Sequence, residues 1–113
     1  MELMGVQSNE IRAINKKHGG TNEMNGNVDT TFANALYHKS FWLRVAAVVR
    51  SIVGGHLFND GNKRTGFDTV RLFQSRNTVV TGVLDAGLRD VMRDIATGRL
   101  SEVEDIAARL RGF

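Results

Sequence analysis

A stretch of nine residues, from His56 to Arg64, gathers side chains that could carry out phosphate chemistry. His56 follows a pair of glycines and carries an imidazole, the side chain that most often serves as a general base near neutral pH. Asp60 can hold Mg²⁺, which binds through one or two carboxylates plus the phosphates of a substrate. Lys63 and Arg64 add positive charge, and arginine can bind phosphate through two donors. Together these residues predict a centre for phosphoryl or nucleotidyl transfer.

The helix expected to follow this stretch supplies a site for an anion. It should begin near Gly61 or Asn62 and run to about Arg76. A helix N-terminus presents free N–H groups and a partial positive charge, and glycine lets the backbone approach a ligand closely. Phe58 is expected to anchor the loop in the core. The sequence therefore predicts that phosphate is held at the start of this helix.

Each residue of the stretch, taken alone, has a simpler interpretation. A basic pair at a helix start is usually solvated, a histidine at a helix end is often structural, and Asp-Gly is often a turn. The stretch is not a Walker loop, because Gly55 and Gly61 are spaced wrongly and Asn62 separates Gly61 from Lys63. It is not a calcium loop either, because the alternating acidic residues are missing. The evidence lies in the combination.

The elements that must position these residues are helices. Apolar residues recur three and four positions apart, most clearly between Phe41 and Val53, and glycines punctuate a chain without proline. Helices are expected over residues 8–18, 29–38, 41–53, 62–76, 84–97 and 101–111. The second should be capped by Asp29 or Thr30, and the last by a capping box at 101–104 with Gly112 beyond its end. We expect an all-α, single-domain fold of five or six helices around the 41–53 helix.

The polar segment between the first two helices, residues 19–29, is the candidate for a small β-hairpin flap. It contains Asn25-Gly26, a dipeptide that favours a tight turn. A hairpin offers free edge N–H and C=O groups to which an extended peptide can add. The alternative is a plain surface loop.

Composition excludes several other classes of site. The 113 residues suit a single domain spanning 1–113, and the absence of cysteine excludes disulfides, thiolate metal sites and cysteine nucleophiles. No apolar run is long enough for a membrane helix, and the N-terminus lacks a secretory pattern, so we expect a cytoplasmic protein without a membrane partner. The net charge of +3 is spread along the chain, which disfavours direct nucleic-acid binding.

The stretch resembles the signature of Fic-domain proteins, His-x-Phe-x-Asp/Glu-Gly-Asn-Gly-Arg-x-x-Arg. The residues that match it in register are His56, Phe58, Asp60, Gly61, Asn62 and Arg64. Lys63 replaces the second glycine and Phe67 replaces the final arginine. Both departures resemble Doc, the death-on-curing toxin branch, whose motif reads His-x-Phe-x-Asp-Ala-Asn-Lys-Arg. Gly61, where Doc has alanine, is the ordinary Fic residue.

The resemblance implies a role for each matching residue. His56 would be the general base that accepts a proton from a hydroxyl of a target protein, and Asp60 would ligate Mg²⁺ bridging the phosphates of ATP. Phe58 would anchor the loop. Arg64 would pair with a phosphate. The anion hole would be formed by Gly61, Asn62 and Lys63.

The resemblance also implies an activity. Ordinary Fic enzymes transfer AMP from ATP to Ser, Thr or Tyr, and their final arginine helps to hold the phosphates. Doc lacks that arginine, binds the nucleotide reversed and transfers the γ-phosphate. With Lys63 present and Phe67 in place of the arginine, we expect an ATP-dependent protein kinase of Doc type. The alternatives are a protein adenylyltransferase and an inactive Fic-fold binding module.

Partners follow from the same resemblance. Doc phosphorylates the translation factor EF-Tu and is restrained by the antitoxin Phd, so a translation factor and a Phd-type antitoxin are the expected partners. The chain carries no self-inhibiting Ser/Thr-x-x-x-Glu-Gly/Asn motif. Asp68 stands where Doc has asparagine. We count it among the phosphate-binding candidates, although its carboxylate would repel phosphates unless a metal ion or Arg71 compensates it.

Overall fold

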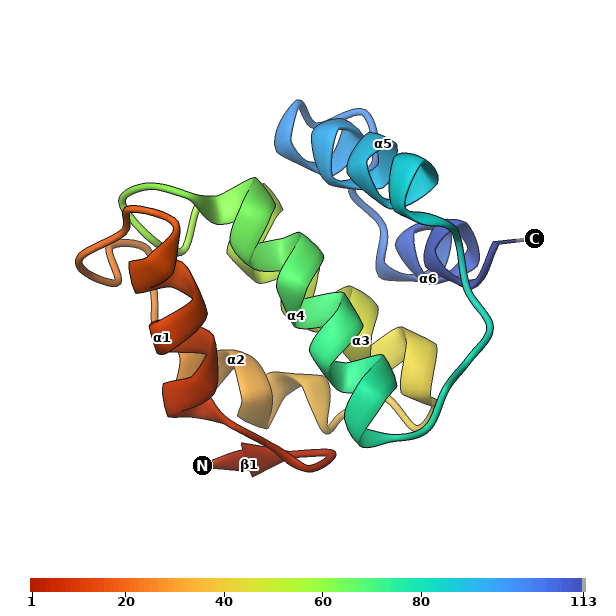
Figure 1. Ribbon diagram of the computed structural model, residues 1–113, viewed down its shortest axis with the longest axis horizontal. Helices are drawn as coiled ribbons and strands as arrows, with labels where there is room; N and C mark the ends of the chain where they lie inside the picture. The colour runs from red at the N-terminus through yellow and green to blue at the C-terminus, as the bar shows by residue number, and fades with distance from the viewer. Residues whose placement is uncertain (113) are drawn as a thin grey trace.

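The protein, seen in a computed structural model that describes residues 1–112, is built from six α-helices and a short N-terminal hairpin within those residues (Figure 1). The elements are β1 Glu2–Leu3, β2 Val6–Gln7, α1 Ser8–Lys17, α2 Val28–Ala35, α3 Phe41–Val49, the π-helical turn η1 Arg50–Gly54, α4 Asn62–Arg76, α5 Asp85–Ala96 and α6 Val103–Arg111. The expected all-α fold is confirmed. Phe113, the last residue of the domain expected over 1–113, lies outside the described residues.

Helix α3 forms the centre of the core. Its apolar residues pack against α2, α4 and α6, and the side chains of Val45, Val48 and Val49 are wholly buried. Burying one such side chain contributes about 1.5–3 kcal/mol relative to leaving it exposed. Figure 1 shows α1 and α5 on opposite sides of α4, and both pack against it. Over residues 1–112, no helix is long and apolar enough to cross a membrane.

The ends of two helices differ from the sequence prediction. Asn27, rather than Asp29 or Thr30, caps α2, and its side chain accepts the Thr30 N–H at 2.8 Å. The prediction of a capping box at 101–104 is wrong as well, because Glu102 is the N-cap of α6 and makes no side-chain capping bond. Gly112 ends α6 in the left-handed conformation, as expected.

The small hairpin lies at residues 2–7, where β1 and β2 pair antiparallel, and not around Asn25-Gly26. The 19–29 segment instead makes one antiparallel bridge, between Glu23 and Phe58. The expected hairpin does not form there because the backbone of this segment bonds to the 56–59 loop rather than to itself.

Candidate active site

His56 is placed by a change of helix type at the end of α3. The expected single helix over residues 41–53 continues past Val49 as the π-turn η1, a feature that is frequent at functional sites. A side chain at Gly55 would come within 2.6 Å of the Ser51 carbonyl oxygen, so only glycine fits there. His56 follows with φ +48°, a backbone conformation that costs a non-glycine residue energy. The turn leaves the His56 side chain exposed to solvent.

Asn62 holds the loop that carries His56 against the start of α4. Its side-chain oxygen accepts the Phe58 N–H at 3.0 Å, and its side-chain nitrogen donates to the Phe58 carbonyl at 2.8 Å. Phe58 itself is buried, with 4% of its surface exposed. The Asn62 side chain therefore holds the loop, and its backbone N–H at the start of α4 remains for an anion.

Asn15 of α1 ties the loop to α4 from the other side, and sequence reasoning missed it. The side chain is buried, and its nitrogen donates to the Asp60 carbonyl at 2.7 Å and to the Thr65 hydroxyl at 3.1 Å. The available signal was a polar residue four positions after Ile11, on the apolar face of the helix. These two bonds fix the position of the loop relative to the first turn of α4.

Gly61 is the N-cap of α4 and has φ +71°, and the chain passes very close to the end of α1 there. A Cβ atom at this position would lie 2.5 Å from the His18 carbonyl oxygen. One oxygen of Asp60, Oδ1, accepts the Gly61 N–H at 2.8 Å. The other, Oδ2, has no hydrogen-bond partner among residues 1–112, so it is open to a cation.

The protein alone does not build a metal cage at this point. No group of three or more His, Cys, Asp or Glu side chains that could hold a metal ion occurs among the described residues. Asp60 offers a single free carboxylate oxygen. This donor set fits Mg²⁺, which commonly takes one or two protein carboxylates and completes its shell with phosphates and water.

The 19–29 segment braces the loop along its outer side. Asn59 accepts the N–H groups of Thr21 and Asn22 at 2.9 and 3.2 Å. The side chain of Asn25, one of the flap candidates, donates to the His56 carbonyl at 2.8 Å. The neighbouring candidate, Gly26, lies next to Leu57, whose side chain would be 3.5 Å from a Cβ at that position.

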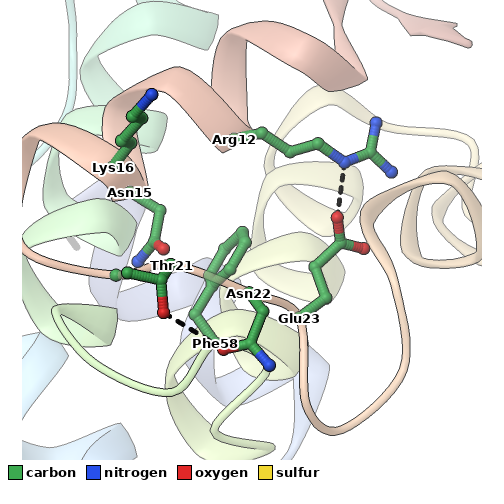
Figure 2. A pocket seen from close by; sticks show the side chains of 8 residues that line it. Arg12, Asn15, Lys16, Thr21, Asn22, Glu23 and Phe58 are labelled. Atoms are coloured by element: carbon green, nitrogen blue, oxygen red, sulfur yellow. Dashed lines mark hydrogen bonds and ion pairs between the residues drawn. The ribbon is translucent and has the colours of Figure 1, made fainter.

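A small pocket of about 290 Å³ separates this segment from α1. Figure 2 shows Arg12 of α1 reaching across to Glu23, with Phe58 between the two walls. Glu23 also accepts the Val28 N–H at 2.9 Å. The ion pair and this bond hold the segment at both α1 and α2.

The predicted site residues meet in a cleft with two adjoining lobes. The first lobe, about 710 Å³, brings together His56, Asp60, Gly61, Asn62, Lys63 and Arg64, whereas the motif's anchor Phe58 lines the small pocket instead. The second lobe, about 560 Å³, is lined by Phe67, Asp68 and Arg89 and shares Lys63 and Arg64 with the first. Each lobe lies within the range of roughly 300–1,000 Å³ that is usual for small-molecule sites.

The negative charge of Asp68 faces a different residue from Arg71, the one that the sequence suggested. Its carboxylate lies 2.7 Å from His18 Nε2, a residue that sequence reasoning missed. Arg71 is engaged elsewhere, with Asp85 at 2.8 Å and with the Val83 carbonyl at 2.8 Å. The Asp68 charge therefore faces an imidazole at the mouth of the cleft, not the guanidinium of Arg71.

Phe67 lies on α4 with Val70 and Phe73 but does not pack fully into the core. Those two side chains are buried, whereas Phe67 is half-buried and lines the second lobe. Its ring lies beneath the guanidinium groups of Arg71 and Arg89, at 5.6 and 5.4 Å from the ring centroid. The two arginines thus cover the ring at the edge of the cleft.

Comparison with protein families shows what the chain is similar to. A sequence model of the Fic/DOC family matches residues 3–74, more than half of the chain, from β1 to most of α4. The matched region contains the whole stretch from His56 to Arg64. The curated proteins contain no match to this chain.

Proposed function

Because the chain belongs to the Fic/DOC family, we propose that it is a nucleotide-dependent transferase of Doc type that moves the γ-phosphate of ATP to a protein hydroxyl. The observation that carries this proposal is the first lobe of the cleft. His56, Asp60 and the N-terminal turn of α4 line the same space, so a base, a metal ligand and an anion site face one substrate.

The residues divide the reaction between them. The exposed imidazole of His56 accepts the proton of the target hydroxyl as its oxygen attacks phosphorus. The free N–H groups at the start of α4 and the side chains of Lys63 and Arg64 bind the charged oxygens of the transferred group. The free oxygen of Asp60 would hold Mg²⁺, which would supply positive charge to the phosphates.

Phosphate transfer is favoured by the residues at the two positions that depart from the Fic signature. Lys63 adds a cation at the start of α4, and Phe67 cannot bind phosphate as the family's final arginine does. AMP transfer is the second candidate function because of the position of Arg89. The Arg89 guanidinium lies over the Phe67 ring, so a cation is present near that position although it comes from another helix.

We infer that the protein substrate docks along the 19–29 segment. The bridge between Glu23 and Phe58 is made by the bonds from Asn59 to Asn22 and from Met24 to Leu57. Among residues 1–112, neither the N–H nor the C=O of Glu23 has a backbone partner. An extended stretch of a target, which we propose to be a translation factor such as EF-Tu, could pair with these groups. A Phd-type antitoxin is the proposed restraint.

Mass spectrometry of translation factors after brief expression in bacteria tests this function. We expect one factor to gain the mass of a single phosphate on a hydroxyl side chain when the wild-type protein is expressed. His56→Ala should abolish the modification. His38→Ala is the matched control, because His38 packs on Tyr37 and does not line the cleft. A gain of one AMP would identify an AMP-transferase instead of a kinase, and the absence of both modifications from every translation factor would contradict both.

A further inference from the structure

Two arginines lie over the ring of Phe67, and their surroundings differ. Arg71 is held by three groups, the carboxylate of Asp85, the Gln74 side chain and a backbone carbonyl. Arg89, on α5, has no hydrogen bond or ion pair among residues 1–112, and its guanidinium lies 5.4 Å from the ring centroid. The ring thus positions a cation whose N–H donors remain free.

The charges around the second lobe do not cancel. Its acidic residue, Asp68, is bonded to His18, and Arg93 is paired with Asp90. Lys63, Arg64 and Arg89 also line this lobe, and none of the three has an acidic partner among the described residues. Cations without partners around a concave surface attract an anion.

The two lobes meet at Lys63 and Arg64, which line both. The side chains of Lys63 and Arg64 therefore border both the space beside His56 and the lobe of Arg89. Whichever end of ATP reacts, two phosphates remain on the leaving group: those of ADP after γ-transfer, or pyrophosphate after AMP transfer. Both kinds of leaving group carry negative charge that the unpaired cations of the second lobe would attract.

We propose that Arg89 binds the leaving-group phosphates of the nucleotide. This inference rests on the proposed transferase function and holds for either transferred group. In the step, the target oxygen forms a bond to the reacting phosphorus and its proton passes to His56. The bond from that phosphorus to the bridging oxygen breaks, and the electron pair stays on the leaving group. The guanidinium of Arg89 compensates the charge that develops there.

Arg89 lies outside the family match, which ends at residue 74. The motif helix of this chain has Phe67 at the position of the family's final arginine. Its ring instead supports a guanidinium that α5 supplies from another part of the fold. The phosphate-binding site is thereby completed by packing between α4 and α5.

Binding measurements by isothermal titration calorimetry test this role. The probes are ATP with Mg²⁺, inorganic triphosphate and adenosine, and the variants are Arg89→Gln, Arg89→Lys and Arg99→Ala. Arg89→Gln keeps a side chain over Phe67 without the charge. Arg99→Ala removes one positive charge from an exposed position beyond α5 and controls for net charge. Each variant's melting temperature is recorded to confirm folding.

We expect Arg89→Gln to lower the affinities for ATP and triphosphate about tenfold, because one charge-assisted contact is lost. Arg89→Lys should fall between it and wild type, because an ammonium cannot bind phosphate bidentately. Arg99→Ala should leave both affinities within about twofold, and adenosine binding should not respond to Arg89. In transfer assays, Arg89→Gln should lower kcat as well as affinity.

The outcomes separate this inference from the proposed function. Equal affinities of Arg89→Gln and Arg99→Ala for ATP and triphosphate would overturn the role of Arg89 and leave transfer untouched. If wild type binds both anions through Arg89 but modifies no protein, the transferase proposal fails while Arg89 remains a phosphate ligand. A wild-type protein that binds neither anion contradicts the inference directly.

Discussion

Replacing Gly61 by alanine would probe the close contact that fixes the start of α4. Gly61 has φ +71°, and an added Cβ would lie 2.5 Å from the His18 carbonyl oxygen and 3.0 Å from His18 Cβ. The oxygen belongs to the backbone at the end of α1, so no side-chain rotation relieves the clash. The resembling Doc motif has alanine here, which makes the substitution informative about how this chain differs from that branch.

The expected cost has two parts that can be separated. A left-handed conformation costs a non-glycine residue about 1–2 kcal/mol. Overpacking adds about 1–3 kcal/mol, so the free energy of unfolding should fall by about 2–5 kcal/mol. Gly98→Ala is the matched control, because Gly98 has φ +79° and a Cβ there would meet nothing within 4 Å. It should show the conformational cost alone.

Thermal unfolding of both variants measures the difference. At about 4 °C per kcal/mol for a chain of this length, Gly98→Ala should melt about 4–8 °C below wild type and Gly61→Ala about 8–20 °C below. Gly61→Ala should also lose transfer activity. The backbone must move to relieve the contact with His18, and this movement displaces the N–H groups of the first turn of α4. Equal melting temperatures for the two variants, with Gly61→Ala still active, would refute the argument from the His18 contact.

Three further substitutions test other parts of the site and fold. Asn62→Ala removes both bonds to the Phe58 backbone and should cost about 1–3 kcal/mol of unfolding free energy, measured by urea denaturation. Asp68→Asn keeps a polar group beside His18 and removes a negative charge from the cleft, so ATP should bind at least as tightly by calorimetry. The side chain of Arg76 on α4 bonds to Glu10 and lowers the pKa of that carboxyl below its ordinary 4.5. The bond therefore stabilises the fold fully above pH 4.5, and this stabilisation is lost as pH falls through the lowered pKa. Glu10→Gln should therefore flatten the loss of melting temperature on acidification.

Each of these expectations can fail in a distinct way. Unchanged urea denaturation of Asn62→Ala would show that the side chain does not hold the loop. Weaker ATP binding by Asp68→Asn that Mg²⁺ excess restores would make Asp68 a metal ligand instead of a partner of His18. An acid profile of Glu10→Gln that overlays wild type would assign the acid sensitivity to another group, of which Asp29 is the first to test, since the Ser8 hydroxyl and Arg12 lower its pKa.

Local patterns in the sequence predicted what local forces determine. The sequence predicts the helix over 62–76 because a glycine precedes it and its apolar residues recur at helical spacing. The structure has the same bounds. The motif residues cluster because they are nearly consecutive. The π-turn η1 was not predicted, since it widens a helix whose apolar stripe looks regular in sequence.

Contacts between distant segments could not be predicted in this way. His18 and Asp68 are fifty positions apart and meet only because α1 packs along α4. Asn15 reaches the loop for the same reason. The 19–29 segment was expected to form its own hairpin because local turn chemistry favours one. It bonds to the 56–59 loop instead, since that loop lies beside it in the folded chain.

The most direct test of the proposed function is transfer from ATP labelled at one phosphate. The wild-type protein, Mg²⁺ and a purified translation factor such as EF-Tu are incubated with ATP labelled at either the α or the γ position, and His56→Ala is run beside it. The expected result is that label reaches a hydroxyl of the target from the γ position only and that His56→Ala transfers none. Label from the α position, or equal transfer by His56→Ala, would contradict it.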